Sequence, residues 1–212
     1  MEGRVRVWLK NAVLLLAIVS LSIAVTINFR PLYAFFVDHY RLYREVGLTR
    51  AQLMIEYGRL LDYLNLPWTG RLQLSLPMSQ SGMTHFADCR KLFLLDYAVC
   101  LLTVPFAVHY VRRLMAERQT WRLINPIRWC FAVIFMIGVF LVSDFEDFFV
   151  TFHEILFRNS DWIFDPDTDP IILALPSEFF MACFGMFIIL FVLLQGLLLW
   201  RGRWELKHAA ED

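Results

Sequence analysis

The hydrophobic and polar positions along the chain form long apolar runs separated by polar segments. Four of these runs are long enough to cross a bilayer as a helix, which takes about 20 apolar residues. They cover residues 9–29, 92–111, 129–150 and 179–200. Backbone groups inside a bilayer must bond within their own segment, so each run predicts a helix. We therefore expect an all-α integral membrane protein with four transmembrane helices, folded as a single membrane domain over residues 1–212.

The segment 30–91, between the first two runs, is expected to contain a helix of its own. Thr49 followed by Gln52 is the pattern of a capping box, in which each side chain bonds the backbone N–H of the other residue. Apolar residues then recur at helical spacing over residues 53–64, and Pro67 ends the pattern. The apolar face of this helix either lies on the outer leaflet or packs on the transmembrane helices.

The basic residues predict the orientation in the membrane. They cluster before the first run, between the second and third runs, and after the fourth, at Arg4, Arg6, Lys10, Arg112, Arg113, Arg118, Arg122, Arg128, Arg201, Arg203 and Lys207. With four spans these clusters share one side, which the positive-inside rule makes the cytoplasm. We therefore expect both termini in the cytoplasm, and the segments 30–91 and 151–176 on the outer side.

Charge and cysteine content exclude some classes of function. The formal net charge is +0, whereas phosphate binding needs a basic excess, so we expect no nucleic acid partner. Of the four Cys, Cys100, Cys130 and Cys183 fall inside apolar runs and are expected to be small core residues. Cys89 lies near His85 and is the one Cys that we consider as a nucleophile.

Polar side chains gather at the outer ends of the second and third runs. His85 and Asp88 are three residues apart, so they share one face of a helix that continues into the second run. His153 and Glu154 follow the third run. Ionisable groups at this depth often mark function, yet such a histidine also serves as a helix cap or a headgroup contact. Spacing alone leaves both interpretations open.

A metal site is not predicted by the spacing of possible ligands. Asp165, Asp167 and Asp169 imitate the start of an EF-hand loop, but Pro170 and Pro176 replace the Gly and Glu that such a loop needs. Other side chains of a suitable ligand type are His85, Asp88, His153 and Glu154. They lack a diagnostic spacing. We therefore expect no metal, and a metal-dependent membrane hydrolase remains an alternative.

The polar segments resemble a known family. THFADCRKLF at 84–93 and FHEILFRNSDWIFDPDTDPIILALPSEFF at 152–180 look like the two signature blocks of the lipoprotein intramolecular transacylases, which are four-span bacterial membrane proteins of about this length. GLTRAQLMIEYGRLLDYLN at 47–65 resembles the outer helix of that family. Cys89 stands where the family pattern has Val, and Leu156 stands where it has Phe. Both replacements are apolar, so the likeness covers most of the outer segments.

The resemblance implies an activity. The family moves the sn-2 acyl chain of a diacylglyceryl lipoprotein to the α-amino group of its N-terminal Cys, and the product is a lyso-form lipoprotein. The expected location is the bacterial cytoplasmic membrane, among membrane lipids, with the active site at the extracytoplasmic face and without a cofactor. The alternative is a non-enzymatic membrane module that binds a partner through the acidic outer loop 151–176.

The residue chemistry fits such a transfer. An amine that attacks an ester must lose a proton, and the leaving glyceryl oxygen must gain one. Imidazole does both near neutral pH, so we expect His85 and His153 to be catalytic, one as base and the other as acid. Asp88 would orient His85, as a triad carboxylate orients its base. The other residues expected to orient groups or bind substrate are Arg90, Arg158, Asn159, Trp162 and Asp165.

Two of these expectations are specific. Asn159, Arg158 or backbone amides would stabilise the oxyanion of the tetrahedral intermediate. Trp162 would form part of the wall of an acyl groove.

Overall fold

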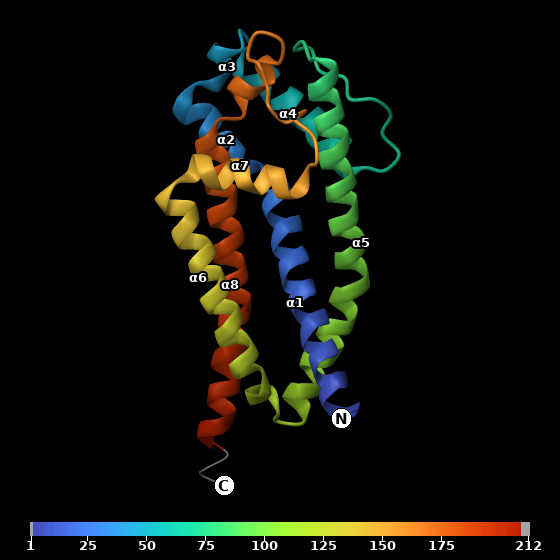
Figure 1. The fold of residues 1–212 in the computed structure, drawn as a ribbon, viewed down its shortest axis with the longest axis vertical. Coiled ribbons are helices and arrows are strands. Elements are labelled where there is room, and N and C mark those ends of the chain that lie inside the picture. Colours follow the sequence, from blue (N-terminus) through green and yellow to red (C-terminus); the bar gives the residue numbers. More distant parts are fainter. Residues whose placement is uncertain (1, 209–212) are drawn as a thin grey trace. The chain divides into compact units, whose positions relative to one another are not determined.

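The computed structural model describes residues 2–208, and these residues form helices joined by turns and loops, without a strand. The α-helices are α1 (Glu2–Asn28), α2 (Arg30–Tyr40), α3 (Leu42–Glu45), α4 (Arg50–Asn65), α5 (Gln80–Ala116), α6 (Ile124–Ser143), α7 (Phe145–Leu156) and α8 (Ser177–His208). Two 3-10 helices complete the fold, η1 (Thr120–Leu123) and η2 (Pro170–Ala174). Figure 1 shows this order of elements.

Four segments are long and apolar enough to cross a membrane: Arg6–Asn28, Gln80–Ala116, Thr120–Ser143 and Ser177–His208. The predicted all-α fold with four spans is therefore confirmed. The run 129–150, expected as one helix, is divided at Asp144. This residue has extended backbone angles, and its side chain accepts the N–H of Asp147, so it begins the separate helix α7.

The contacts divide the chain into two compact units. Unit 1 comprises the described residues of 1–26, 96–142 and 185–212, and unit 2 comprises residues 27–95 and 143–184. The prediction of a single membrane domain stays a prediction.

Unit 1 is held together by an apolar core and by one buried carboxylate. Leu14, Leu123 and Phe191 are among the buried residues of the core. Glu205 is also buried, and its carboxylate accepts the backbone N–H of Thr120 at 2.7 Å and the hydroxyl of Thr120 at 2.8 Å. This pair fixes the start of η1 to the last part of α8.

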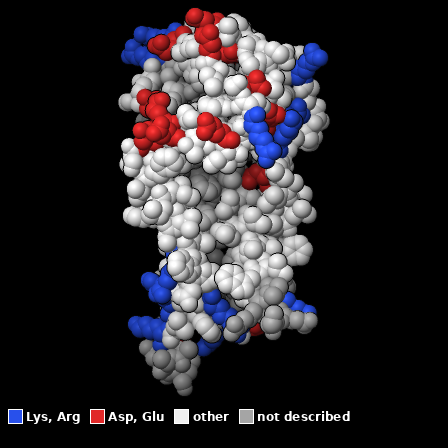
Figure 2. Space-filling model, viewed as in Figure 1, with Lys and Arg blue, Asp and Glu red and all other residues white. Residues whose placement is uncertain are grey.

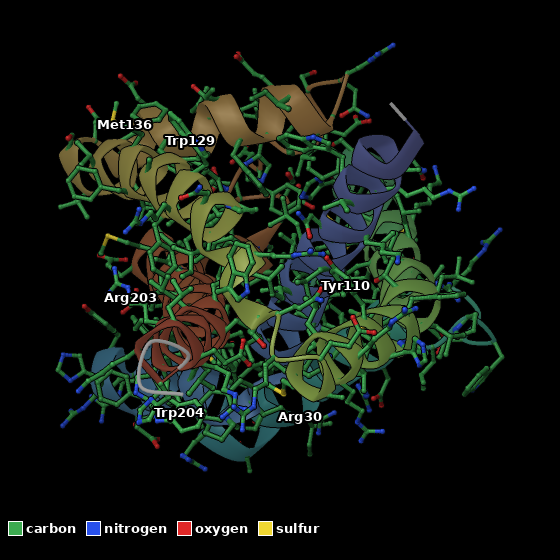
Figure 3. All side chains as sticks on the ribbon, turned by 90° about the horizontal axis from the view of Figure 1, so that it is seen from below. Arg30, Tyr110, Trp129, Met136, Arg203 and Trp204 are labelled. Carbon is green, nitrogen blue, oxygen red and sulfur yellow. The ribbon has the colours of Figure 1, made fainter. Side chains whose placement is uncertain are left out.

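The exterior of unit 1 has the pattern of a membrane protein. Trp129 and Met136 on α6 point outward and are 75% and 67% exposed, as lipid-facing side chains would be (Figure 3). Tyr110 points inward instead, and its hydroxyl donates to Asn11 at 3.0 Å. The Lys and Arg of unit 1 gather at the end where α5 connects to α6, and most of the remaining surface of this unit in that view is uncharged (Figure 2).

Unit 2 has its own core, built by α2, α4, η2 and the first turns of α8. Tyr33 is fully buried, stacks on Tyr57 at 3.7 Å between ring centroids, and donates its hydroxyl to the carbonyl of Ala174 at 3.0 Å. Phe179 packs edge-on against Tyr33 at 5.2 Å. These contacts join segments that are far apart in the sequence.

Helix α4 begins with the predicted capping box, since Thr49 accepts the N–H of Gln52 and Gln52 accepts the N–H of Thr49. Its apolar face is buried in the core of unit 2, so this face packs on protein rather than on the outer leaflet. Glu56 is also buried, and it accepts the N–H of Ser75 at 2.8 Å. That bond holds the loop 66–79 against α4.

Candidate active site

Unit 2 brings together the two histidines expected to be catalytic. His85 lies on the second turn of α5, and His153 lies on α7, which crosses the direction of α5 (Figure 1). Their ring centroids are 5.8 Å apart, although the residues are far apart in the sequence. Each residue is only 8% exposed. Both imidazoles are therefore within reach of one reacting group.

The hydrogen bonds of His153 determine its tautomer. Nδ1 lies 2.7 Å from the carbonyl oxygen of Phe149, one turn earlier on α7. A carbonyl only accepts, so Nδ1 carries the hydrogen and Nε2 of the neutral ring carries the lone pair. Burial lowers the pKa of His153 below its ordinary value, although the bond to Phe149 opposes this shift. The neutral ring therefore offers Nε2 as a proton acceptor.

His85 has a thiol neighbour. Sγ of Cys89, one turn later on α5, lies 3.3 Å from Nε2 of His85 and 4.0 Å from Nδ1. Cys89 is partly buried and packs against the apolar core of unit 2, as a small core residue does. The position of Cys89 therefore suits contact with the imidazole better than attack on an ester.

Aromatic rings surround both histidines, and two of them were not expected at the site from the sequence. Phe157 is buried and touches both imidazoles, with centroids 4.8 Å from His85 and 5.7 Å from His153. Phe164 lies edge-on to His85 at 5.5 Å. Trp162, which was expected at the site, lies 4.9 Å from His153. The only signal for the two Phe in the sequence is their place in the second signature block.

Asp88 lies three residues from His85, as expected, but its carboxylate bonds elsewhere. Oδ1 accepts Nζ of Lys91 at 2.7 Å, and Oδ2 accepts Nδ2 of Asn159 at 3.2 Å. Asp88 therefore connects α5 to the loop after α7, and its direct partners are Lys91 and Asn159.

Arg90 points to the loop 66–79. Its guanidinium donates to the carbonyl oxygens of Leu66, Pro67, Thr69 and Gly70 at 2.8 to 3.3 Å. It also lies over the ring of Tyr63 at 4.7 Å. A hollow of about 470 Å³ lies beside this loop, between residues 59 and 75, and its lining does not include His85 or His153.

The remaining expected residues lie on the loop 157–169. Arg158 and Asn159 are exposed, and the carbonyl of Asn159 accepts Nε1 of Trp162 at 2.9 Å. Asp165 is exposed and organises the next turn, because its side chain accepts the N–H of Asp167 at 3.0 Å. Asp169, which was considered only as part of a failed calcium motif, is instead buried at 2% exposure.

The described residues contain no group of three or more His, Cys, Asp or Glu side chains placed to hold a metal ion. The side chains around His85 and His153 are mainly aromatic.

The sequence and the fold are similar to those of known proteins. The model of the family described as lipoprotein intramolecular transacylase Lit matches residues 9–180. The solved structure of the membrane integral lipoprotein intramolecular transacylase Lit from Bacillus cereus is similar with a TM-score of 0.88 and 28% identity, over 100% of this chain and 99% of that chain. A search of the curated proteins gave no match.

Two further solved structures are of the same Bacillus cereus protein with an H85R mutation and with an H85A mutation. Their TM-scores are 0.81 and 0.82, at 26% and 25% identity. They cover 99% and 100% of this chain, and 94% and 96% of their own chains.

Proposed function

Because the chain belongs to the lipoprotein intramolecular transacylase family, we propose that it moves the sn-2 acyl chain of a diacylglyceryl lipoprotein to the α-amine of the N-terminal Cys. The protein is a membrane-integral acyltransferase. In the proposed reaction the bond between the acyl carbon and the glyceryl oxygen breaks, and an amide bond to the amine forms. One proton passes from the amine to the glyceryl oxygen, which leaves a lyso-form lipoprotein.

His153 is the proposed base. Its Nδ1 is bonded to the Phe149 carbonyl, so the free Nε2 takes the proton of the attacking amine. The imidazolium that results can return this proton to the glyceryl oxygen, as the histidine of a serine protease triad does for its leaving group. One observation supports this proposal above all: the hydrogen bond to Phe149 leaves Nε2 of His153 free, and the His153 ring lies 5.8 Å from the buried His85 ring, measured between centroids.

His85 is the proposed hydrogen-bond donor to the glyceryl oxygen. A buried neutral imidazole can polarise an oxygen through its N–H without becoming charged, as in triosephosphate isomerase. His85 thus stabilises the charge that develops on the glyceryl oxygen, while the proton itself travels through His153. Every proton is then accounted for, and neither ring needs to be charged before the amine attacks.

The polar residues around the pair have proposed supporting roles. Asn159 and Arg158 are proposed donors to the oxyanion of the tetrahedral intermediate, which is typically worth about 2.7 to 4 kcal/mol per donor. Asp88 is proposed to hold the side chain of Asn159 in position, because its carboxylate accepts a hydrogen bond from the Asn159 amide. Trp162 is proposed to form a wall of the acyl groove beside His153.

The proposed test follows the N-terminal lipopeptide of a diacylglyceryl lipoprotein that is incubated with the enzyme in phospholipid vesicles. Mass spectrometry distinguishes the diacylglyceryl form from the N-acylated lyso-form by the position of the acyl chain after fragmentation. His153→Ala and His85→Ala should each lower the rate of transfer by about 10²- to 10⁴-fold, which is the usual contribution of acid–base catalysis.

His39→Ala is the matched control, because His39 also belongs to unit 2 but is exposed, stacks on Phe35 and lies edge-on to Tyr40. This variant should keep the activity of the wild type. Transfer that survives both His85→Ala and His153→Ala would refute the histidine pair. A wild type that leaves the lipoprotein diacylated would refute the proposed reaction.

A further inference from the structure

Asp169 is a buried carboxylate at the start of the helix that carries His85. Its Oδ1 accepts the backbone N–H of Ser79, just before α5, at 2.8 Å, and its Oδ2 accepts the hydroxyl of Thr168 at 2.8 Å. The first turn of α5 approaches it closely at Gly82, where a Cβ atom would collide with Oδ1 of Asp169. A negative charge is also favourable at a helix N-terminus. Asp169 is therefore firmly attached to α5.

A second attachment lies on the other side of His85. Nδ2 of Asn159 donates to Oδ2 of Asp88 at 3.2 Å. His85 lies between the two attachments along the chain, three residues after Gly82 and three residues before Asp88. The loop 157–169, which we call the strap, joins the two attachments, and its rings contact His85 between them, so it passes over His85 in the direction opposite to α5.

The strap turns aromatic rings inward and exposes mainly polar residues, with Ile163 as an apolar exception. Phe157 and Phe164 turn inward and contact the His85 ring at 4.8 Å and 5.5 Å between centroids. The outer side carries exposed residues, which include Arg158, Ser160, Asp165, Asp167 and Thr168. This division is what a cover between water and a reaction site needs, since the inner rings exclude water and the outer groups are solvated.

We propose that the strap, fastened by Asp169 on Ser79 and Gly82, keeps water from His85 and His153 and so makes the enzyme a transferase instead of a hydrolase. The inference rests on the proposed function, because it concerns the fate of the same acyl group. Asp169 is then a positioning residue, which acts through Phe157 and Phe164 and does not touch the substrate.

The chemical alternative is hydrolysis at the same ester. If water reaches Nε2 of His153, the ring takes a proton from water as it would from the amine, and the oxygen of water attacks the acyl carbon. The bond to the glyceryl oxygen breaks, this oxygen receives the proton, and a free fatty acid leaves. The lipoprotein is then a lyso-form with a free α-amine. The ratio of free fatty acid to N-acylated product thus measures how well water is excluded.

The experiment compares this ratio between variants, with a synthetic diacylglyceryl lipopeptide in phospholipid vesicles made with oxygen-18 water. Asp169→Ala removes the fastening, and we expect the ratio of fatty acid to N-acylated product to rise by at least about tenfold. The released fatty acid should carry oxygen-18. Gly82→Ala should act in the same direction, because its methyl group displaces the Asp169 carboxylate even though Ala favours a helix.

Asp167→Asn is the matched control, because this carboxylate belongs to the same strap and is exposed. It should leave the ratio at the wild-type value. The double variant of Gly82→Ala with Asp169→Ala should be no worse than Asp169→Ala alone, since both changes release one contact. If Asp169→Ala folds poorly, Gly82→Ala tests the inference instead. The ratio of fatty acid to N-acylated product is measured per turnover, so it does not depend on how much enzyme is folded.

A fall in total turnover with an unchanged ratio in both variants would overturn the strap inference while leaving the histidine pair intact. Failure of the wild type to transfer, or transfer without the two histidines, would instead overturn the proposed function. The two failures are therefore distinguishable in one set of assays.

Discussion

One backbone carbonyl, that of Phe149, decides which nitrogen of His153 can accept a proton. The sequence indicates that His153 and His85 lie on the outer side, because each adjoins the end of an apolar run that is opposite to the basic clusters. It cannot indicate the tautomer, since that depends on a carbonyl four residues away on a helix whose start was not predicted. Asp88 shows the same limit: the spacing allows contact with either His85 or Lys91, and the structure has the contact with Lys91.

The burial of His153 has a consequence for stability at low pH. Because burial lowers its pKa in the folded state, the unfolded chain protonates this ring first as the pH falls below about 6.5. The neutral buried ring therefore stabilises the fold above that pH, and this contribution is lost as the pH falls through the lowered pKa. His153→Gln has no ring to titrate.

We expect the thermal midpoint of the wild type in detergent to fall more steeply than that of His153→Gln as the pH is lowered from 6.5. His39→Gln, an exposed histidine, should keep the wild-type slope. Equal slopes for the wild type and His153→Gln would show that the folded and unfolded states bind protons equally at this ring.

Among the helices, the sequence predicts best those features that depend on residues close together in the chain. Thr49 and Gln52 form the capping box expected from their spacing, because both partners lie within one turn. The end of α6 was not predicted, since Asp144 lies inside a continuous apolar run and hydropathy averages over a single carboxylate. The strap was not predicted either. Its order depends on Asp169 meeting the start of α5, and this contact spans a large separation in sequence.

The loop 66–79 is held by Arg90. The planar guanidinium of this residue donates hydrogen bonds to four carbonyl oxygens of the loop and also lies over the ring of Tyr63. Lysine keeps the charge but cannot donate in several fixed directions, so Arg90→Lys should loosen this loop. Amide hydrogen exchange over residues 66–79 should become at least about tenfold faster, which corresponds to a loss of about 1.4 kcal/mol.

Arg71→Lys is the control for this experiment, because Arg71 lies in the same loop and is exposed. It should leave the exchange rates unchanged. Unchanged rates in Arg90→Lys would mean that the loop does not depend on the guanidinium of Arg90 and is held by other contacts, such as that of Ser75 with Glu56.

For the molecule as a whole, the orientation in the membrane remains a prediction from charge. The Lys and Arg of unit 1 gather at the end where α5 meets α6 (Figure 2), and the positive-inside rule then makes this end cytoplasmic. The order of the spans in the sequence predicts that the strap, within the segment 151–176, lies on the other side of the membrane. Exposed positions for a label are available in both units, at Ser160 on the strap and at Arg203 on α8.

A membrane-impermeant maleimide should therefore label Ser160→Cys on intact cells and label Arg203→Cys only after the membrane is opened. The wild type is the control, because its four native thiols are partly buried. The reverse pattern of labelling would place the basic end outside.

Every residue proposed for the chemistry belongs to unit 2, whereas lipid-facing side chains such as Trp129 and Met136 belong to unit 1. Bilayers differ in hydrocarbon thickness by a few Å, and membrane proteins adjust to this through the length of their apolar stretches. Relatives living in thicker or thinner membranes can thus lengthen or shorten the α6 surface without altering a group near the histidines. For α6, adaptation to lipid and adaptation to substrate are therefore separate problems.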